Sequence, residues 1–303
     1  MRAAAIDVGT NSVQSCVGET SAHGVEFILE TTTNTRLGQG IGVSRELIPE
    51  AIERTISAIE ADVASIRRMD VDTVRIVGTS AVRDAVNSKD FIRQLKEAVG
   101  IELQPLSGQE EARFSYCAVS RDPQFADFTG QQVVLDVGGG STEMIQGTGP
   151  YMGFIVSVKA GAVRFTEKFL QGDPPTHSQR IDAEVMAERL LGNVARKLEV
   201  ARCIGVGGSI VNLARVIEQI PIERSKEVHG SILRMADLRA TIDRLILMKS
   251  DDRKRIIGLE PERSDIIVAG AVIIERAIES FGLDSIIVSG RGIRHAVVFE
   301  ILG

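Results

Sequence analysis

Short hydrophobic runs, separated by glycine and polar turn residues, open the chain. Residues 2–8, 12–18 and 24–32 have the composition of β-strands, and turn residues stand between them at Gly9-Thr10-Asn11 and His23-Gly24. We therefore predict an antiparallel meander at the start of the chain.

A longer stretch after this meander repeats its apolar residues at helical spacing. Ile52, Ile56 and Ile59 begin a pattern that continues to Ile66, and Ser44 is the predicted N-cap of this helix. The segments that follow are a strand running into a loop over 73–81, a helix over 88–100 that ends at Gly100, a strand over 101–106 and a helix over 107–120 with a capping box formed by Ser107 and Glu110.

The same order of elements starts again near residue 130. After an irregular stretch at 122–132, the predicted elements are strands at 132–137, 141–146 and 151–158, helices at about 160–170 and 181–199, a strand at 202–206, and further helices interrupted by a strand in SIIVSG. This repetition predicts an α/β fold of two duplicated domains, 1–125 and 126–291, with a helix at about 292–303 packed back on the first. A cleft between the halves is the expected ligand site.

Composition and charge narrow the range of functions. The 303 residues are 44% hydrophobic and 25% charged, and no apolar run reaches membrane-spanning length. The chain starts without a signal-peptide pattern, and its three cysteines have neither metal-ligand spacing nor an even count, so we expect a cytoplasmic protein with free thiols. The net charge of −6 argues against general binding to nucleic acid, so an anionic partner must be held by a local basic pocket.

Two stretches place an aspartate and glycines directly after a hydrophobic strand. AAAIDVGTNSVQSCV carries Asp7, and VVLDVGGGSTEMI carries Asp136 followed by Gly138, Gly139 and Gly140. Backbone N–H groups in such a turn form a concave anion site that glycine leaves open to phosphate oxygens, and the aspartate is placed to hold Mg²⁺ or a water against that phosphate. A single loop of this kind is often only a tight turn. Because each half of the chain has one, we predict that the two loops bind one phosphate chain from both sides.

These loops resemble the phosphate loops of the actin, sugar kinase and Hsp70 superfamily, whose duplicated actin-like domains have a ribonuclease H-like fold with an interdomain cleft. GVGGS at 205–209 occupies the place of the superfamily's third glycine loop. Within the superfamily, the chain resembles the short, two-domain members of the exopolyphosphatase / guanosine pentaphosphate phosphohydrolase (Ppx/GppA) family. The blocks that carry this resemblance, in family order along nearly the whole chain, are GTSAVRDAVN (78–87), SGQEEARFSY (107–116), SVKAGAVRFTEKF (157–169), VHG (228–230) and SGRGIR (289–294).

The resemblance implies a Mg²⁺-dependent phosphohydrolase, with the following roles. Glu111, directly before Ala-Arg, is then the catalytic base, Asp136 and Glu143 are catalytic carboxylates linked to the metal, and Asp7 lies near the metal or its waters. The residues implied in substrate binding are Gly9, Thr10, Asn11, Ser12, Arg83, Gly138, Gly139, Gly140, Ser141, Thr142, Gly207, Gly208, Ser209 and Arg294. Weaker candidates are Arg113, Lys159, Arg164, Arg291 and His229, whereas Glu110 is explained by its capping box.

Several functions stay open at this point. The favoured one is hydrolytic release of terminal phosphate from inorganic polyphosphate, and the nearest alternative is the same reaction on guanosine pentaphosphate. A sugar or acetate kinase and a non-enzymatic, nucleotide-binding assembly or sensor protein are the remaining alternatives. The family also implies a homodimer. Arg291 and His295 stand where the family usually has a small residue and a glutamate. These two differences leave the identity of the substrate open, but they do not affect the type of reaction that is expected.

Overall fold

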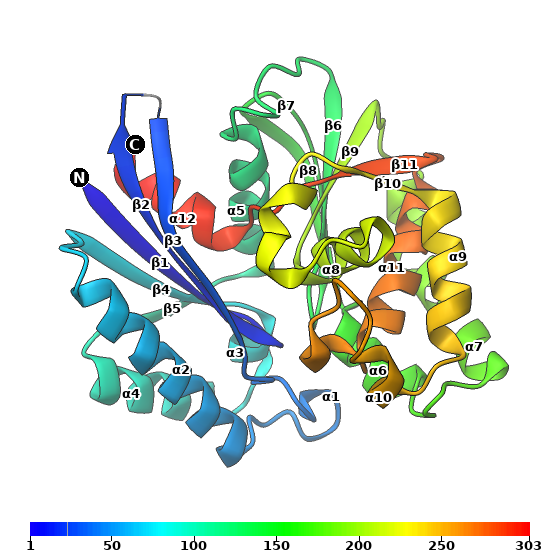
Figure 1. Cartoon of the computed structure of the whole chain (residues 1–303), viewed down its shortest axis with the longest axis horizontal. Helices are drawn as coiled ribbons and strands as arrows, with labels where there is room; N and C mark the ends of the chain where they lie inside the picture. The colour runs from blue at the N-terminus through cyan, green and yellow to red at the C-terminus, as the bar shows by residue number, and fades with distance from the viewer. Residues whose placement is uncertain (23) are drawn as a thin grey trace. The chain divides into compact units, whose positions relative to one another are not determined.

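The computed structural model describes residues 1–22 and 24–303, and the chain divides into two compact units (Figure 1). The first unit contains Met1–Phe114 and Gly292–Gly303, and the second contains Ser115–Arg291. The boundary between the units at Phe114 and Ser115 therefore lies inside helix α5 (Gly108–Ser120). The domain limits expected from the sequence stay a prediction.

The first unit is a five-stranded sheet with helices on both faces. Its strands have the order β3-β2-β1-β4-β5, in which β1, β2 and β3 are antiparallel neighbours and β4 and β5 continue parallel to β1. The elements are β1 (Arg2–Val8), β2 (Ser12–Ser21), β3 (Gly24–Asn34), α1 (Ile41–Ser44), α2 (Pro49–Arg67), β4 (Thr73–Gly78), α3 (Ser80–Asp84), α4 (Ser88–Val99), β5 (Leu103–Pro105), the start of α5, and α12 (Ile293–Leu302).

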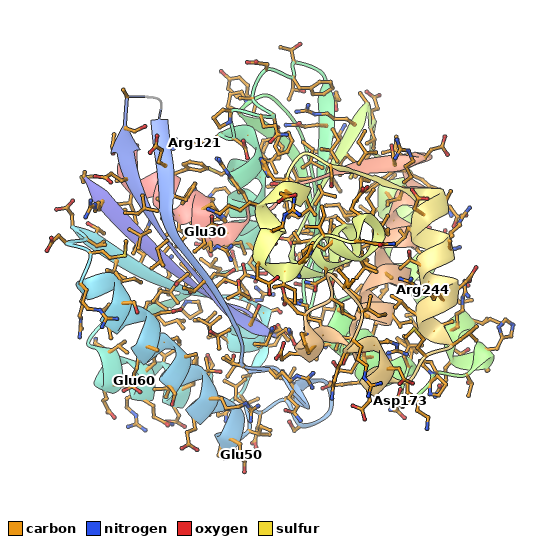
Figure 2. All side chains as sticks on the ribbon, in the orientation of Figure 1. Glu30, Glu50, Glu60, Arg121, Asp173 and Arg244 are labelled. Atoms are coloured by element: carbon orange, nitrogen blue, oxygen red, sulfur yellow. The ribbon has the colours of Figure 1, made fainter. Side chains whose placement is uncertain are left out.

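The alternation of side chains along β1 explains how both faces are covered. Ala4, Ile6 and Val8 point into the core that contains α2 and α4. Gly18 lies opposite Ala3 on the other face, where Val298 of α12 packs so closely that a Cβ on Gly18 would lie 2.6 Å from it. Glu50 and Glu60 lie on the exposed side of α2 (Figure 2).

The second unit has a six-stranded sheet in the order β10-β11-β9-β6-β7-β8. Helix α11 is buried over nearly its whole length and forms the centre of its core. The elements are β6 (Gln131–Val137), β7 (Thr142–Thr148), β8 (Tyr151–Val158), α6 (Ala162–Phe169), α7 (His177–Ala195), β9 (Arg202–Val206), α8 (Gly208–Glu218), a 3-10 segment (Ile222–Val228), β10 (Ile232–Arg234), α9 (Met235–Ile246), α10 (Ser250–Arg253), a second 3-10 segment (Pro261–Arg263), α11 (Ile267–Ser280) and β11 (Ser285–Val288).

The predicted repetition is confirmed by the two sheets. In the first, β3, β2 and β1 form an antiparallel meander with β4 parallel to β1, and in the second, β8, β7 and β6 form the same meander with β9 parallel to β6. The α/β class is therefore confirmed, and the duplication with it.

Some predicted boundaries are wrong. Ser44 ends the short helix α1 instead of capping a long one, because Arg45 has a left-handed backbone (φ 59°) and Pro49, which lacks an N–H, occupies the first turn of α2. The helix predicted at 181–199 begins at His177, where Thr176 and Gln179 form a capping box, and ends at Ala195.

The turn predicted at His23-Gly24 includes His23, which lies outside the described residues. In the part of the chain that the structure describes, none of the helices is both long and apolar enough to cross a membrane.

Candidate active site

The first glycine loop joins β1 to β2 in the first unit. Asp7 lies opposite Gln14 in the antiparallel ladder, so both side chains point to the same face of the sheet. At the turn, the Gly9 amide donates to the Ser12 carbonyl oxygen at 2.9 Å, and a Cβ on Gly9 would lie 3.0 Å from that oxygen. Glycine at this position therefore allows the close approach that shapes the turn.

The carbonyl groups of the first loop are tied to the segment that follows β3. The Arg36 amide donates to the Asn11 carbonyl and the Gly38 amide donates to the Thr10 carbonyl, both at 2.8 Å. Within the described chain, the amides of Thr10 and Asn11 donate no hydrogen bond. These two N–H groups are therefore available to an anion.

Two predicted binding residues of the first loop use their side chains to hold the loop itself. The Thr10 hydroxyl lies 2.8 Å from the Ser80 hydroxyl, and Asn11 Nδ2 donates to Asn34 Oδ1 at 2.8 Å. Thr10 and Asn11 are both buried. Their backbone amides, rather than their side chains, are the groups left for a ligand.

The adjacent glutamates at the start of α5 have different surroundings, as the sequence predicts for Glu110. The Ser107 amide donates to Glu110 Oε2 at 2.8 Å and the Glu110 amide donates to Ser107 Oγ at 3.2 Å, so the capping box is confirmed. The bonds from Ser107 lower the pKa of Glu110. Glu111 points about 100° away around the helix and is only 4% exposed.

An ion pair holds Glu111. Arg83 Nη1 donates to Glu111 Oε1 and, at 2.9 Å, to the Leu106 carbonyl. The guanidinium thus offsets the cost of burying a carboxylate. Arg83 belongs to α3, which begins at Ser80. The block GTSAVR therefore contacts the first glycine loop through Ser80 and Glu111 through Arg83.

The second glycine loop repeats this turn in the second unit. Asp136 lies opposite Glu143 in the β6–β7 ladder, so two carboxylates share one face of the sheet. The Gly138 amide donates to the Ser141 carbonyl at 3.0 Å. Gly138, Gly139 and Gly140 are not among the glycines with a positive φ, so a left-handed turn is not the reason for them.

Helix α6 binds the carbonyl groups of the second loop. The amides of Ala162 and Val163 donate to the carbonyls of Gly138 and Gly139, both at 2.9 Å, and Arg164 Nε donates to the Gly140 carbonyl at 2.9 Å. The first amides of α6, which have no partner within their own helix, are satisfied in this way.

Gly161, which precedes α6, packs against the backbone of the second loop, while the amides of that loop remain without a hydrogen-bond acceptor in the described chain. A Cβ on Gly161 would overlap with the backbone of Gly139. In the described chain, the amides of Gly139, Gly140 and Ser141 donate no hydrogen bond, which makes them a candidate phosphate site.

Asp136 is enclosed by two other segments of its unit. Ser115 Oγ, on a fully buried side chain of α5, donates to Asp136 Oδ2 at 2.5 Å. A Cβ on Gly207, which has a φ of 96°, would lie 2.9 Å from Asp136 Oδ1. Burial raises the pKa of Asp136, and the hydrogen bond from Ser115 acts in the opposite direction.

The Asp136–Glu143 pair suits a hard divalent cation. Glu143 is 2% exposed and accepts a hydrogen bond from Ser157 Oγ at 2.6 Å. Mg²⁺ is commonly bound through one or two carboxylates together with substrate phosphates, so this donor set fits the predicted metal. Among the described residues, no three His, Cys, Asp or Glu side chains form a metal cluster on their own. The assignment of Asp7, Asp136 and Glu143 to a metal stays a prediction.

The third glycine loop is held by charged residues. Helix α8 begins at Gly208, and a Cβ there would overlap with the guanidinium of Arg263. Arg263 pairs with Glu260 at 2.7 Å, and Glu260 accepts a second bond from Arg215 at 2.9 Å. Ser209 is buried, so the loop presents mainly the backbone of Gly207 and Gly208.

The sequence pattern of the Ppx/GppA phosphatase family matches residues 16–303. The chain belongs to the Ppx/GppA phosphatase family. It is therefore an enzyme, a phosphatase of this family, and the predicted resemblance is confirmed. The match begins after the first glycine loop, but the relatives below align over the whole chain.

Relatives and solved structures agree with this assignment. Exopolyphosphatase 2 of Mycobacterium tuberculosis is 31% identical over all of this chain and 99% of its own length. A crystal structure of the Ppx/GppA family member of Aquifex aeolicus has a TM-score of 0.84 and 31% identity, covering 100% of this chain and 97% of that one. An exopolyphosphatase from Cytophaga hutchinsonii, at 22% identity, is similar in fold, with a TM-score of 0.91 over 100% of this chain and 98% of its own.

Arg291 and His295, the two residues that differ from the usual family pattern, each contact a carboxylate. Arg291 Nε is 3.2 Å from Asp122 Oδ2, an oxygen that also lies 3.1 Å from His229 Nε2. His295 Nε2 lies 3.1 Å from Glu30 Oε2. Arg291 and His229, weak candidates from the sequence, thus share a partner within their own unit.

Arg294, a predicted substrate-binding residue, contacts the first sheet. It donates to Gln14 Oε1 and, at 3.2 Å, to Glu30 Oε2. Figure 2 shows Glu30 on this sheet beside α12. Because Gln14 is the cross-strand partner of Asp7, Arg294 reaches the face on which Asp7 lies. Its role in substrate binding stays a prediction.

Sequence reasoning missed the residues that position the loops. Ser80, Ser115 and Gly161 lie inside blocks that carry the family resemblance, but only their contacts with Thr10, Asp136 and Gly139 show why they are needed. One signal was present for Ser115. It follows Glu111 by one helical turn, so both residues lie on the same side of α5.

Proposed function

We propose that this protein is an exopolyphosphatase, which releases terminal phosphate from inorganic polyphosphate by hydrolysis with Mg²⁺. The observation that carries the proposal is the pair of loops whose carbonyls are bonded to neighbouring segments while their amides, at Thr10–Asn11 and at Gly139–Ser141, donate to nothing in the described chain. Successive free amides of this kind recognise phosphate oxygens. The name of the M. tuberculosis relative supports the same activity.

The residues around these loops favour a chain of phosphates over a nucleotide. The loops at 7–14, 136–143 and 207–209 contain no aromatic residue that could stack on a base. They offer amides, hydroxyls and carboxylates, which suit phosphate and its counterion. Guanosine pentaphosphate, the substrate in the family's alternative activity, is therefore the comparison substrate in the test below.

Each residue has a role in the proposed reaction. The loop amides hold the terminal phosphoryl group, and a Mg²⁺ ion held by Asp136 and Glu143 would offset its charge. Glu111, fixed by Arg83, accepts a proton from the attacking water. The water oxygen bonds to the terminal phosphorus as the bridging P–O bond breaks, so one orthophosphate leaves and the chain shortens by one unit.

The test compares two adjacent glutamates. Glu111→Gln removes the proton acceptor but keeps the shape of the side chain, so we expect kcat for polyphosphate to fall by roughly a hundredfold or more, with binding preserved. Glu110→Gln is the matched control, because it changes only the capping box. Phosphate release from polyphosphate, guanosine pentaphosphate and ATP is measured with and without Mg²⁺ on wild type and both variants.

Three outcomes would contradict the proposal. Near-normal turnover of Glu111→Gln would remove Glu111 from the mechanism. Faster phosphate release from guanosine pentaphosphate than from polyphosphate would mean that guanosine pentaphosphate is the preferred substrate. Transfer of the ATP phosphate to a small acceptor would indicate a kinase.

A further inference from the structure

The C-terminal helix α12 places two adjacent polar residues against one carboxylate of the first sheet. Arg294 Nη2 and His295 Nε2 lie 3.2 Å and 3.1 Å from the same oxygen, Glu30 Oε2 on β3 (Figure 2). Arg294 and His295 are 9% and 2% exposed, and the Glu30 side chain is half-buried. Two nearly buried donors therefore converge on one oxygen, which holds the carboxylate firmly on this face of the sheet.

The ring of His295 has a defined orientation. Its Nδ1 accepts a hydrogen bond from the Gly292 amide at 3.0 Å, so the proton of the neutral imidazole lies on Nε2, which donates to Glu30. The Phe27 ring packs edge-on against His295, with the two ring centroids 4.6 Å apart. His295 therefore caps the first turn of α12 and at the same time holds Glu30.

A chain of side-chain hydrogen bonds leads from this carboxylate to the first glycine loop. Arg294 donates from Nη2 to Glu30 and from Nη1 to Gln14 Oε1. Because Oε1 of Gln14 accepts, its amide nitrogen Nε2 faces the other way and donates to Ser12 Oγ at 3.4 Å. Ser12 is 5% exposed, and its carbonyl closes the loop by accepting the Gly9 amide. The residue that ends the loop is thus connected to α12 through Gln14.

We propose that Arg294, supported by Glu30 and His295, is a positioning residue that orients Gln14 and through it Ser12, and that Arg294 makes no contact with the phosphate. This role replaces the one in substrate binding that the family resemblance implies. The ion pair with Glu30 offsets the charge of the guanidinium, so the pair as a whole attracts a polyanion only weakly. Arg294 Nε is covered by protein as well. The inference rests on the proposed function, because it concerns a loop that we propose to bind phosphate.

The two roles of Arg294 predict opposite effects when Glu30 is neutralised. If Arg294 binds phosphate, Glu30→Gln removes a competing negative charge and strengthens polyphosphate binding. If Arg294 is a positioning residue, the same variant loses the partner that orients the guanidinium, and we expect kcat/KM for polyphosphate to fall by roughly threefold to tenfold. Glu300→Gln is the matched control, because Glu300 is a carboxylate on α12 that pairs with two other arginines, Arg75 and Arg113. This control is expected to keep the wild-type kcat/KM.

Variants of Arg294 itself provide a second test. Arg294→Lys keeps the positive charge, but its single ammonium group cannot reach Gln14 and Glu30 as a planar fork does. We expect it to lose as much kcat/KM as Arg294→Gln, and we expect Glu30→Gln to add little to either loss because these residues act through the same contacts. Polyphosphate binding should depend on salt to the same degree in wild type and in Arg294→Gln, because no phosphate contact is lost.

Nuclear magnetic resonance of the whole chain without substrate separates this proposal from the proposed function. With isotope-labelled glutamine, the side-chain amide signals of Gln14 are assigned through Gln14→Asn. They are expected to shift in Glu30→Gln and in Arg294→Lys but not in Glu300→Gln. A wild type that releases no phosphate from polyphosphate, while these shifts appear, would contradict the proposed function but support the hydrogen-bond chain to the loop.

Four results would overturn the positioning role. They are tighter polyphosphate binding in Glu30→Gln, recovery of activity in Arg294→Lys relative to Arg294→Gln, a smaller salt dependence of binding in Arg294→Gln, and Gln14 signals that do not shift in Glu30→Gln.

Discussion

The first and second glycine loops have the same backbone arrangement but differ in their side chains. In both, a glycine amide donates to the carbonyl three residues later, from Gly9 to Ser12 and from Gly138 to Ser141. In both, the following carbonyls are bonded to another segment, and the amides beside them are left open. The part of the loop that we propose to bind phosphate is therefore duplicated in the backbone, where the identity of most side chains matters little.

The side chains on the neighbouring strands differ in charge. Asp7 lies opposite an amide, Gln14, whereas Asp136 lies opposite a second carboxylate, Glu143. Gln14 accepts a hydrogen bond from Arg294, and Glu143 accepts one from the neutral Ser157. Of these two loops, the second has two carboxylates on one face of its sheet and the first has one. If the proposed roles hold, both halves bind phosphate and the second also binds the cation.

The loops also differ in what braces them. Thr10 and Asn11 hold the first loop through their own side chains, which bond to Ser80 and Asn34. The second loop has glycines at these places and is held instead by the start of α6. Glycines can therefore replace residues with polar side chains in the second loop, because the N-terminus of α6 donates the hydrogen bonds that hold the loop.

The largest expected effect comes from adding a side chain to the second loop. Gly139→Val places a β-branched group beside the open amides, so we expect most polyphosphate affinity and activity to be lost while the variant stays folded, with a somewhat lower melting temperature. Thr10→Val, at the matching place in the first loop, removes a hydroxyl but adds no bulk and should cost much less. Thermal melts and binding isotherms are compared for both. Normal hydrolysis by Gly139→Val would remove the second loop from the phosphate site.

A smaller effect is expected from the two serine hydroxyls that brace the loops. Ser115 donates to the carboxylate of Asp136, whereas Ser80 bonds to the neutral hydroxyl of Thr10. Hydrogen bonds to charged groups contribute about 1.5–3 kcal/mol and neutral ones about 0.5–1.5 kcal/mol. We therefore expect kcat to fall by roughly tenfold to a hundredfold in Ser115→Ala and by only a few-fold in Ser80→Ala. Equal losses in the two variants would mean that the charge on Asp136 is not what makes Ser115 important.

The sequence predicted those features that depend on local pattern. The two meanders follow from alternating runs of strand-forming residues between turns, and the end of α4 at Gly100 follows from the left-handed backbone that glycine adopts there. The different surroundings of Glu110 and Glu111 follow from a three-residue capping offset.

The features that it could not predict depend on contacts between distant segments. Gly161 looks like any turn glycine until the structure brings it against Gly139, and nothing near Gly207 in the sequence shows that it touches Asp136. Thr10 and Asn11 are predicted substrate-binding residues, but the spacing of the sequence does not reveal that their side chains bond to Ser80 and Asn34. Local pattern thus located the loops, and packing decided which of their atoms remain open.

The smallest expected effect concerns a third pair of matching turns, Ser80 after β4 and Ser209 after β9. The first rests on a hydroxyl contact, whereas the turn at Ser209 is held through Arg263 and Glu260. Burial alone would raise the pKa of Glu260, but Arg263 and Arg215 outweigh it and lower the pKa from 4.5 to about 2.

Because the folded-state pKa of Glu260 is depressed, its contribution to stability is complete above pH 4.5 and is lost as the pH falls toward about 2. Glu260→Gln should therefore lower the melting temperature at neutral pH and flatten its decline between these pH values. Glu102→Gln, which removes an exposed ion pair with Lys96 in the first unit, is the control and should change little. Thermal unfolding followed from neutral pH to about pH 2.5 provides the comparison. An unchanged acid profile in Glu260→Gln would mean that the arginines do not hold this turn through charge.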